Sequence, residues 1–321
     1  MYNSGIDPEV ISLELDISKD SILETIKKEQ DKKELADPKT NQPIYFLNKF
    51  YLDAVIDINS LIKDSQIRMW NALKVKPDFN ISIKETQNIL EKYVESKINL
   101  VILHIDLVGS TRMSLSLPID RLTTIVRSFA QQMSIIVSMY GGYVLKYIGD
   151  AVLAFFVIED NSYNSNNNDD DLDDNNNNKF NNRFNSFQYD NAISCAYTMI
   201  KVIQEGINPI LNQYDYPDLN VRVGIDFGEI AVVQYGWDIE EYDEKVLKKP
   251  HLDLIGYTIS IVVKMTTLAK PDNIVIGQKL FNKIDPKHKT LFAKLNSNPD
   301  IWNYSIESTG KIYDLYGSKI K

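Results

Sequence analysis

The sequence predicts an α+β fold in which a ferredoxin-like βαββαβ core follows an N-terminal helical extension. Short apolar runs of strand length alternate with longer segments whose apolar residues recur every three or four positions. From residue 101 onward these segments read strand, helix, strand, strand, helix, strand, which is the split βαβ arrangement. We therefore expect an antiparallel sheet with helices on one of its faces.

The N-terminal extension is assigned to residues 1–95, and its role is open. Residues 1 to about 43 are polar and include a charged stretch, which is typical of a solvated helix followed by a loop. The segment 45–73 has one apolar helical face, and a second helix is expected over 83–98. The apolar face must be buried, either against the chain's own larger domain or against a second copy of the chain.

The larger domain is assigned to residues 96–321 and begins with a buried strand over 101–106. A long amphipathic helix is expected directly after Pro118, since proline is favoured at helix starts. Two apolar segments, 143–148 and 151–157, then predict a β-hairpin.

An insert rich in Asn and Asp interrupts this domain at residues 159–188. Its few apolar residues cannot offset the entropy lost on ordering, so we expect it to be disordered. A second amphipathic helix is predicted to begin at Asp190, and strands are predicted over 221–227 and 229–235, on either side of Gly228.

The last part of the chain contains shorter elements. A charged loop or arm is expected over 237–250 and a helix over 257–269. Strands are expected over 273–276, 291–295 and 311–316. A short helix is also expected before the last two strands.

The composition excludes several function classes. The chain has 321 residues, of which 44% are hydrophobic and 25% charged, as in ordinary globular proteins. The formal net charge of −9 and the lack of a basic aromatic stripe argue against nucleic acid as a partner. No apolar run could span a bilayer, and the N-terminus has Asp7 and Glu9 in place of a basic signal, so we expect a cytoplasmic protein without membrane insertion. The single cysteine, Cys195, excludes an internal disulfide.

Two aspartates interrupt the apolar runs of the core. Asp106 closes the first run, and it is followed by Gly109, Ser110 and Thr111, whose N–H groups and hydroxyls could surround an anion. Asp150 lies inside the second run. Because unpaired charges beside buried strands are costly, we interpret the two carboxylates as a site that holds Mg²⁺ against a phosphate. The alternative is that each one caps a helix or a turn.

Four short motifs follow one another from the first core strand onward. They are HIDLVGST (104–111), YGGYVLKYIGD (140–150), RVGIDFG (222–228) and HLDLIGYTIS (251–260). In this order and spacing they resemble the catalytic domain of the class III nucleotidyl cyclases, over about the last two thirds of the chain. These cyclases have a ferredoxin-like core, so the resemblance implies the same fold as the periodicity.

The resemblance implies an enzyme with two Mg²⁺ or Mn²⁺ ions per active site. In the family the ribose 3′-hydroxyl attacks the α-phosphate in line and expels pyrophosphate. By motif position, Asp106, Asp150 and the carbonyl of Leu107 would be metal ligands, and the backbone of residues 108–111 would cradle the phosphates. A tight turn with a capped helix is the plainer interpretation of that backbone segment.

Two further residues match the positions that select the base in adenylyl cyclases. Lys146 would donate to adenine N1, and Asp253 would accept from the adenine 6-amino group. Guanine has a carbonyl oxygen at that position, and its lone pair would face the carboxylate. The pair therefore favours ATP, although Lys146 alone would be interpreted as a surface lysine on a strand.

The sequence departs from the family at two catalytic positions. Ser260 stands where the family has an asparagine that orients the ribose, and Lys264 stands where it has an arginine that stabilises charge at the reacting phosphate. Lysine keeps the charge but lacks the planar fork of arginine. Loss of one transition-state donor costs on the order of 10²–10³ in rate. The usual Ala-Gly after the third motif is also replaced, by Ala231-Val232.

The family builds each active site between two chains, so the resemblance implies a homodimer in which the aspartates of one copy face the base-selecting residues of the other. The preferred hypothesis is a homodimeric adenylyl cyclase that makes 3′,5′-cyclic AMP. A cyclase-like regulatory module that binds a nucleotide with little or no turnover is the alternative from another class. A guanylyl cyclase is the third hypothesis.

Overall fold

The computed structural model describes residues 56–74, 84–158, 174–242, 245–296, 298, 300–306 and 309–319, with side chains except at 84, 174–186 and 240–247. All of them belong to one compact unit, Leu47–Lys321. The polar segment 1–43 lies outside the described residues, so its helix and loop stay predictions. The assignment of residues 1–95 as an N-terminal helical extension of unknown role also stays a prediction, although residues 56–74 and 84–95 of it are described.

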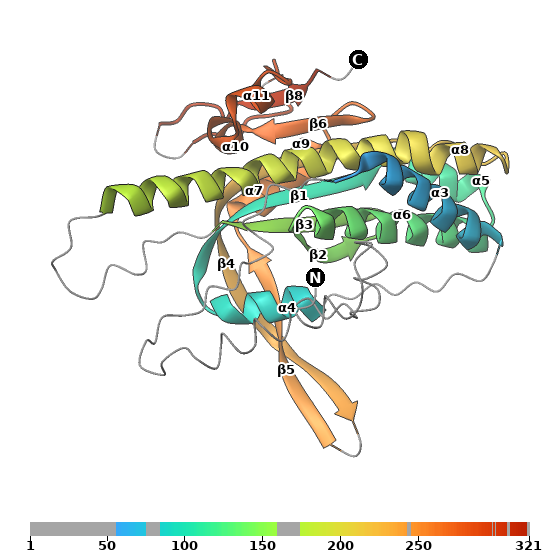
Figure 1. Cartoon of the computed structure of the whole chain (residues 1–321), viewed down its shortest axis with the longest axis horizontal. Coiled ribbons are helices and arrows are strands. Elements are labelled where there is room, and N and C mark those ends of the chain that lie inside the picture. The colour runs from blue at the N-terminus through green and yellow to red at the C-terminus, as the bar shows by residue number, and fades with distance from the viewer. Residues whose placement is uncertain are drawn as a thin grey trace, which may run out of the picture. The chain divides into compact units, whose positions relative to one another are not determined.

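The described residues form one eight-stranded mixed sheet (Figure 1). Four of its strands, in the spatial order β2-β3-β1-β4, are β2 (Tyr143–Ile148), β3 (Ala151–Ile158), β1 (Lys97–Leu107) and β4 (Val221–Tyr242). Each neighbouring pair among these four is antiparallel. Helix α6 (Ile119–Met139) connects β1 to β2, and α7 (Asp174–Val202) lies between β3 and β4. This is the predicted βαββαβ core, and the α+β class is confirmed.

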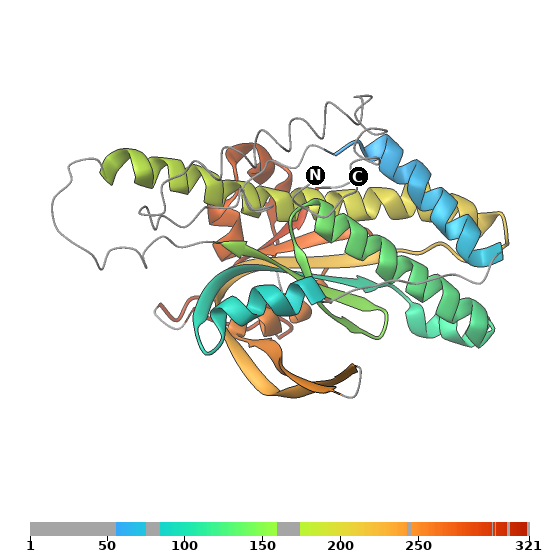
Figure 2. The ribbon, with the colours of Figure 1, turned by 60° about the horizontal axis from the view of Figure 1, so that its bottom comes forward.

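Both faces of β1 are buried, each in a different core. Val101, Leu103 and Ile105 pack with residues of α6 and α7. Leu100 and Ile102 point to the other face, where α4 (Lys84–Leu90) and α9 (Tyr257–Thr266) contribute to a second core. Helices therefore cover both faces of the sheet (Figure 2) and not one as the pattern predicts, which explains why β1 reads as a continuous apolar run.

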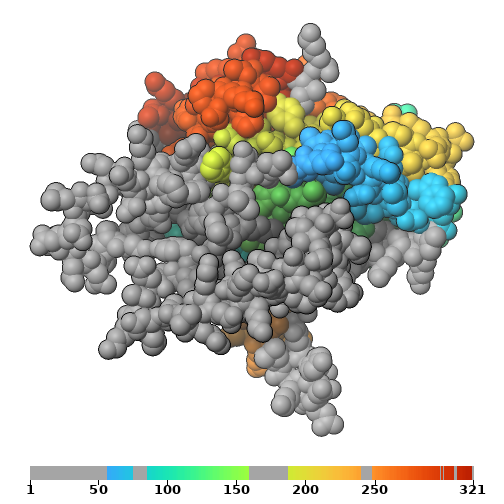
Figure 3. Space-filling model, in the orientation of Figure 1, coloured from blue at the N-terminus to red at the C-terminus, as the bar shows by residue number. Residues whose placement is uncertain are grey.

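Helix α3 (Ile58–Lys74) packs on its own chain. Its buried residues include Leu61, Met69 and Leu73, and it contacts α6, α7 and α8 (Asn208–Asn212). In Figure 3 it lies in blue at the surface beside the yellow part of the chain that holds α7 and α8. Of the two alternatives for this apolar face, the described residues show packing within the chain. The earlier part of the predicted helix, 45–55, lies outside them.

Helix α7 begins at Asp174, well before the expected start at Asp190. Asn-rich turns have low helix propensity. Extending a helix that already exists needs no new nucleus, however, and each added residue gains a hydrogen bond. Residues 159–173 of the predicted disordered insert lie outside the described residues. Farther along α7, Cys195 is fully buried, as a small core residue would be.

Strand β4 runs unbroken through Gly228, where the sequence predicts two strands. A Cβ atom at Gly228 would lie 2.2 Å from Oγ1 of Thr258 on α9. The glycine therefore permits the close approach of a helix and does not break the strand. The outer part of β4 pairs with β5 (Lys245–Ile255), and Figures 1 and 2 show the two strands projecting from the sheet as an arm. The predicted loop or arm is thus a β-hairpin.

The C-terminal strands extend the sheet beyond β4. They are β6 (Asn273–Gly277), parallel to β4, then β8 (Leu315–Ser318) and β7 (Phe292–Lys294), with α10 (Gln278–Lys283) and α11 (Pro286–Lys289) between β6 and β7. The strand predicted at 311–316 begins only at Leu315. Among the described residues, none of the helices has an apolar stretch long enough to cross a membrane.

Candidate functional site

The two aspartates predicted to bind metal lie at the same end of neighbouring strands. Asp106 is the next-to-last residue of β1, and Asp150 lies in the turn between β2 and β3. In the register of β1 and β3, Ile105 is opposite Val152, so pairing brings both aspartates to one end of the sheet. Gly149 begins the turn with φ of +63°, a conformation that favours glycine.

Arg222 is the group that contacts Asp106. The register of β1 and β4 places these residues opposite each other, and Arg222 Nη2 lies 2.5 Å from Asp106 Oδ2. The two side chains are 27% and 22% exposed, so this charge-assisted hydrogen bond is partly shielded from water. The sequence marks Arg222 only as part of a motif. Its role becomes visible once the pairing of β4 with β1 is known.

Asp150 has a carboxylate oxygen without a partner. Among the described residues, its Oδ2 is enclosed and accepts no hydrogen bond. Buried carboxylate oxygens are normally paired, either by hydrogen bonds or by a metal. In the described part of the chain there is no cluster of three or more His, Cys, Asp or Glu side chains that could hold a metal. Mg²⁺, however, is often bound by one or two carboxylates plus substrate phosphates. Asp106 and Asp150 fit a cation that binds together with a polyphosphate.

His104 lies two residues before Asp106 and is buried. Its Nδ1 is 3.1 Å from Oγ1 of Thr266, which itself donates to the carbonyl of Val262. Nδ1 therefore carries the proton and donates. Burial lowers the pKa of His104, while Asp106 raises it and Arg222 lowers it further. The imidazole is neutral at pH 7 and adds no charge beside the aspartates.

The turn after β1 is left-handed at Gly109, with φ of +73°, and α5 (Ser110–Ser116) begins directly after it. A Cβ atom at Gly109 would meet nothing within 4 Å, so the glycine serves the turn conformation and not packing. The Val108 N–H donates to the carbonyl of Asn220 at 2.8 Å, so this part of the predicted phosphate cradle is committed to the sheet. The phosphate role of the residues after Val108 stays a prediction.

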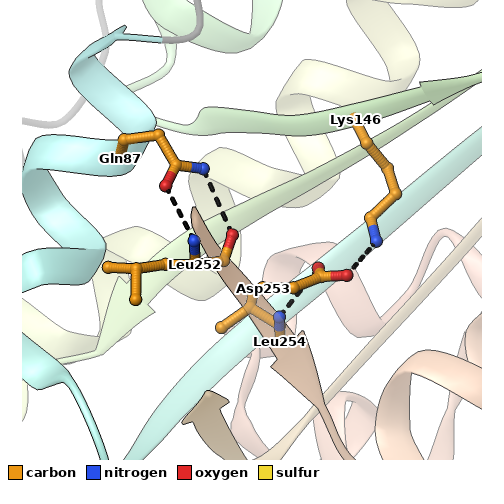
Figure 4. Close-up of polar contacts among 5 residues, drawn as sticks. All are labelled: Gln87, Lys146, Leu252, Asp253 and Leu254. Carbon is orange, nitrogen blue, oxygen red and sulfur yellow. Dashed lines mark hydrogen bonds and ion pairs between the residues drawn. The ribbon is translucent and has the colours of Figure 1, made fainter. Parts of the chain in front are cut away.

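The two predicted base-selecting residues contact each other. Lys146 Nζ lies 2.5 Å from Asp253 Oδ2, and Figure 4 shows the two side chains pointing toward one another from different strands. Lys146 follows a bulge in β2 at Val144, which changes the direction of the strand. The other carboxylate oxygen of Asp253 accepts the N–H of Leu254 at 2.8 Å. The structure therefore brings together a donor and an acceptor that are far apart in the sequence.

Helix α4 contacts both strands that hold this pair. Gln87 Nε2 donates to the carbonyl of Leu252 at 3.2 Å, and Gln87 Oε1 accepts the N–H of the same residue at 3.1 Å (Figure 4). Thr86 Oγ1 donates to the carbonyl of Val144 at 2.7 Å. Sequence reasoning missed both residues, because they carry no charge and belong to none of the four motifs.

Ser260 and Lys264 lie four residues apart on α9, and both are exposed. Lys264 Nζ is 5.5 Å from the centre of the Tyr304 ring, a cation–π distance. No hydrogen bond or ion pair between described residues joins either one to Asp106 or Asp150. Their roles at the ribose and the phosphate stay predictions.

Asp226, in the third motif, is a buried carboxylate that the sequence does not single out. It accepts hydrogen bonds from the Tyr313 hydroxyl at 2.8 Å and from the N–H groups of Phe227 and Leu280 at 2.9 and 3.3 Å. Burial raises its pKa to about 6, and these hydrogen bonds oppose the rise. The bond to Leu280 ties the start of α10 to β4.

A separate hollow of about 200 Å³ lies between α4, α6 and β2. Its lining includes Thr86, Ser134, Tyr143 and Tyr147 but none of the predicted site residues. The candidate site is therefore made of two groups, the aspartate pair with Arg222 and the Lys146–Asp253 pair. Among the described residues, no hydrogen bond or ion pair joins the two groups.

Comparison with known proteins finds that the chain is similar to nucleotide cyclases. No protein-family model matches the chain. A curated relative, "Cytidylate cyclase" from Escherichia coli, is 26% identical over 204 residues, which cover 63% of this chain and 39% of the relative. The chain thus matches about two fifths of the length of that relative.

Solved structures with a similar arrangement are also cyclases. The adenylyl cyclase CyaB from P. aeruginosa has a TM-score of 0.47 and 16% identity, covering 70% of this chain and 96% of that one. The non-canonical dimeric guanylyl cyclase domain of the RhoGC fusion protein from the aquatic fungus Blastocladiella emersonii has a TM-score of 0.44 and 15% identity, covering 70% and 98%. With its four ordered motifs, its βαββαβ core and its curated relative, the chain is similar to the catalytic domains of the class III nucleotidyl cyclases.

Proposed function

We propose that the protein is a nucleotide cyclase, which converts a nucleoside triphosphate to a 3′,5′-cyclic nucleotide and pyrophosphate. In this reaction a bond forms between the ribose 3′-oxygen and the α-phosphorus, and the bond to the pyrophosphate oxygen breaks. The 3′-hydroxyl proton passes to solvent. The observation that carries the proposal is the position of Asp106 and Asp150 at one end of paired strands, with an unpaired carboxylate oxygen between β2 and β3.

Asp106 and Asp150, with the carbonyl of Leu107, are proposed to hold two divalent cations, Mg²⁺ or Mn²⁺. Such cations neutralise the triphosphate and lower the pKa of the attacking hydroxyl. The protein has a net charge of −9 and would otherwise repel this substrate. The charge-assisted hydrogen bond from Arg222 holds the Asp106 carboxylate in place before the substrate binds.

Lys146 and Asp253 are proposed to bind the edge of the base. Together they present a donor beside an acceptor. Adenine matches them with a ring nitrogen that accepts and an amino group that donates, which makes ATP the first candidate substrate. Guanine and uracil have a carbonyl in place of this amino group, and they would leave the carboxylate facing a lone pair.

CTP is the second candidate substrate, and a specific observation favours it. The curated relative is named a cytidylate cyclase. Cytosine presents the same pattern as adenine, an accepting ring nitrogen next to a donating amino group. The Lys146–Asp253 pair would therefore select bases that carry an amino group at this edge. The space available around the base must decide between purine and pyrimidine.

We further propose that the active site forms between two copies of the chain. Among the described residues of one copy, no hydrogen bond or ion pair joins Asp106 or Asp150 to Ser260 or Lys264, which is consistent with the family arrangement in which the two groups come from different chains. Ser260 and Lys264, exposed on α9, would act at the ribose and the phosphate of a nucleotide held by the other copy. If these two substitutions abolish turnover, the protein is a nucleotide-binding regulatory module.

The test is product analysis by mass spectrometry after incubation of the purified protein with equal concentrations of ATP, CTP, GTP and UTP and either Mg²⁺ or Mn²⁺. We expect a cyclic product from ATP, from CTP or from both, at a rate roughly tenfold or more above GTP and UTP. Equal rates for all four would remove the base-selecting role of Lys146 and Asp253. No cyclic product, with binding of nucleotide still seen by calorimetry, would support the regulatory module.

A further inference from the structure

Helix α4 stands outside the four motifs, but it contacts both strands of the proposed base site. Its Gln87 side chain makes two hydrogen bonds to one backbone residue, Leu252, which directly precedes Asp253. Its Thr86 hydroxyl binds the carbonyl of Val144, two residues before Lys146. Adjacent residues of one short helix therefore hold the two strands from which the base-selecting side chains project. Figure 4 shows the contact of Gln87 with Leu252 beside the Lys146–Asp253 pair.

The geometry at Leu252 explains why Gln87 is needed there. In an antiparallel pair, alternate residues direct their N–H and C=O groups away from the partner strand. Among the described strands β5 pairs with β4 alone, so such groups on its other side need acceptors and donors from elsewhere. The amide of Gln87 supplies one donor and one acceptor in the required order, whereas a carboxylate or an ammonium would supply only one kind.

The contact of Thr86 has a similar effect on the other strand. β2 is an edge strand of the sheet, and its pairing with β3 is irregular between Val144 and Lys146. An irregular edge strand is poorly fixed by its ladder alone. The buried hydrogen bond from Thr86 fixes the carbonyl at the bulge, just before Lys146.

We propose that Gln87 is a positioning residue for base selection. Through its two hydrogen bonds to the Leu252 backbone, it fixes the position of Asp253 relative to Lys146. The inference rests on the proposed function, since it concerns the same site. Thr86 performs the corresponding task for Lys146. Gln87 itself touches neither the substrate nor the metal site, so its loss alters the fit of the base and leaves the aspartate pair unchanged.

The test compares Gln87→Ala with Asn88→Ala, which removes an amide from the exposed neighbour on the same helix. Cyclic product is measured for ATP, CTP and GTP over a range of concentrations. For Gln87→Ala we expect KM for the preferred nucleotide to rise about tenfold, and its preference over GTP in kcat/KM to fall about tenfold. We expect kcat at saturation to stay within about threefold. Asn88→Ala should match the wild type.

Gln87→Glu is a second variant in case the alanine protein does not fold. It keeps the length of the side chain and the acceptor for the Leu252 N–H, but it places a carboxylate oxygen against the Leu252 carbonyl. We expect the same loss of base preference. If both variants keep the wild-type KM and base preference, the inference is wrong and the proposed function stands. If the wild type forms no cyclic product from any nucleotide, the proposed function fails and the inference with it.

Discussion

At the scale of single residues, the two aspartates of the proposed metal site have different surroundings. Asp106 is paired with Arg222 at 2.5 Å, whereas Asp150 has an enclosed oxygen that none of the described residues satisfies. Removal of Asp106 would leave a partly buried arginine without its partner and would harm the fold as well as the site. A substitution of Asp150 is therefore the better test of function, because it should alter activity without lowering the stability of the fold.

We expect Asp150→Asn to reduce cyclic product formation by on the order of 10²-fold or more, because a neutral amide is a poor ligand for a hard cation. Its free energy of unfolding in urea should be equal to or above that of the wild type, because the substitution removes an unpaired charge. Mn²⁺ together with ATP should raise the melting temperature of the wild type more than that of the variant. Retained turnover in a folded variant would exclude Asp150 as a metal ligand.

Asp226 gives the protein a pH-dependent stability. Burial raises its pKa from an ordinary value of 3.8 to about 6, so the folded protein holds this proton more tightly than the unfolded chain does. The resulting stabilisation is present in full below pH 4 and is lost as the pH rises through about 6. This difference between the pKa values of the folded and unfolded states corresponds to about 3 kcal/mol in the free energy of unfolding.

Urea unfolding between pH 4.5 and pH 7.5 measures this effect. The free energy of unfolding of the wild type should fall with rising pH more steeply than that of Asp226→Asn, which has no proton to lose at this position. Identical slopes for the two proteins would show that Asp226 does not titrate in this range.

At the scale of elements, α3 contributes to the stability of the core. Met69 is 2% exposed and Ile67 is 50% exposed on the same helix. We expect Met69→Ala to lower the free energy of unfolding in urea by about 2–5 kcal/mol, because it leaves a cavity beside α6 and α7. Ile67→Ala should change it by no more than about 0.5 kcal/mol. Equal effects would mean that α3 is not packed on the core in solution.

The elements that could be predicted from the sequence are those with a strong and complete pattern. The hairpin of β2 and β3 appears within about one residue of its predicted bounds, and a long helix begins directly after Pro118 as predicted, because the glycine turn and the helical periodicity are both local signals. The strand break predicted at Gly228 is wrong, because the contact that requires a glycine there comes from Thr258 on a helix distant in the sequence. A loop or arm is predicted where β4 and β5 project, but their strand pairing is not, because the charged residues there lack a strand pattern.

The distinction between local sequence signals and contacts from distant elements also holds for the candidate site. Asp106, Asp150, Lys146 and Asp253 are found from motifs, and the structure shows the contact between the last two. Arg222 and Gln87 act through strand register and through a backbone contact. Neither kind of contact leaves a pattern in one sequence.

At the scale of the whole molecule, one sheet carries two half-sites. The first half-site is the Asp106–Asp150 pair, and the second is the Lys146–Asp253 pair. We propose that the end with Asp106 and Asp150 binds cations and phosphates, and that Lys146 on β2 and Asp253 on β5 bind a base. The central claim is that a nucleotide is cyclised between the first half-site of one copy and the second half-site of another. Two inactive variants, each with one half-site intact, should then complement one another.

The most direct test mixes Asp150→Asn with Lys146→Met in equal amounts and measures cyclic product from ATP and CTP. Each variant alone should lose on the order of 10²-fold or more of the wild-type activity. In the mixture, half of the dimers contain one of each chain, and each of these has one fully intact site, so about a quarter of the wild-type activity should return. An inactive mixture of two variants that are both dimeric by light scattering, or full activity from a monomeric wild type, would contradict the shared site.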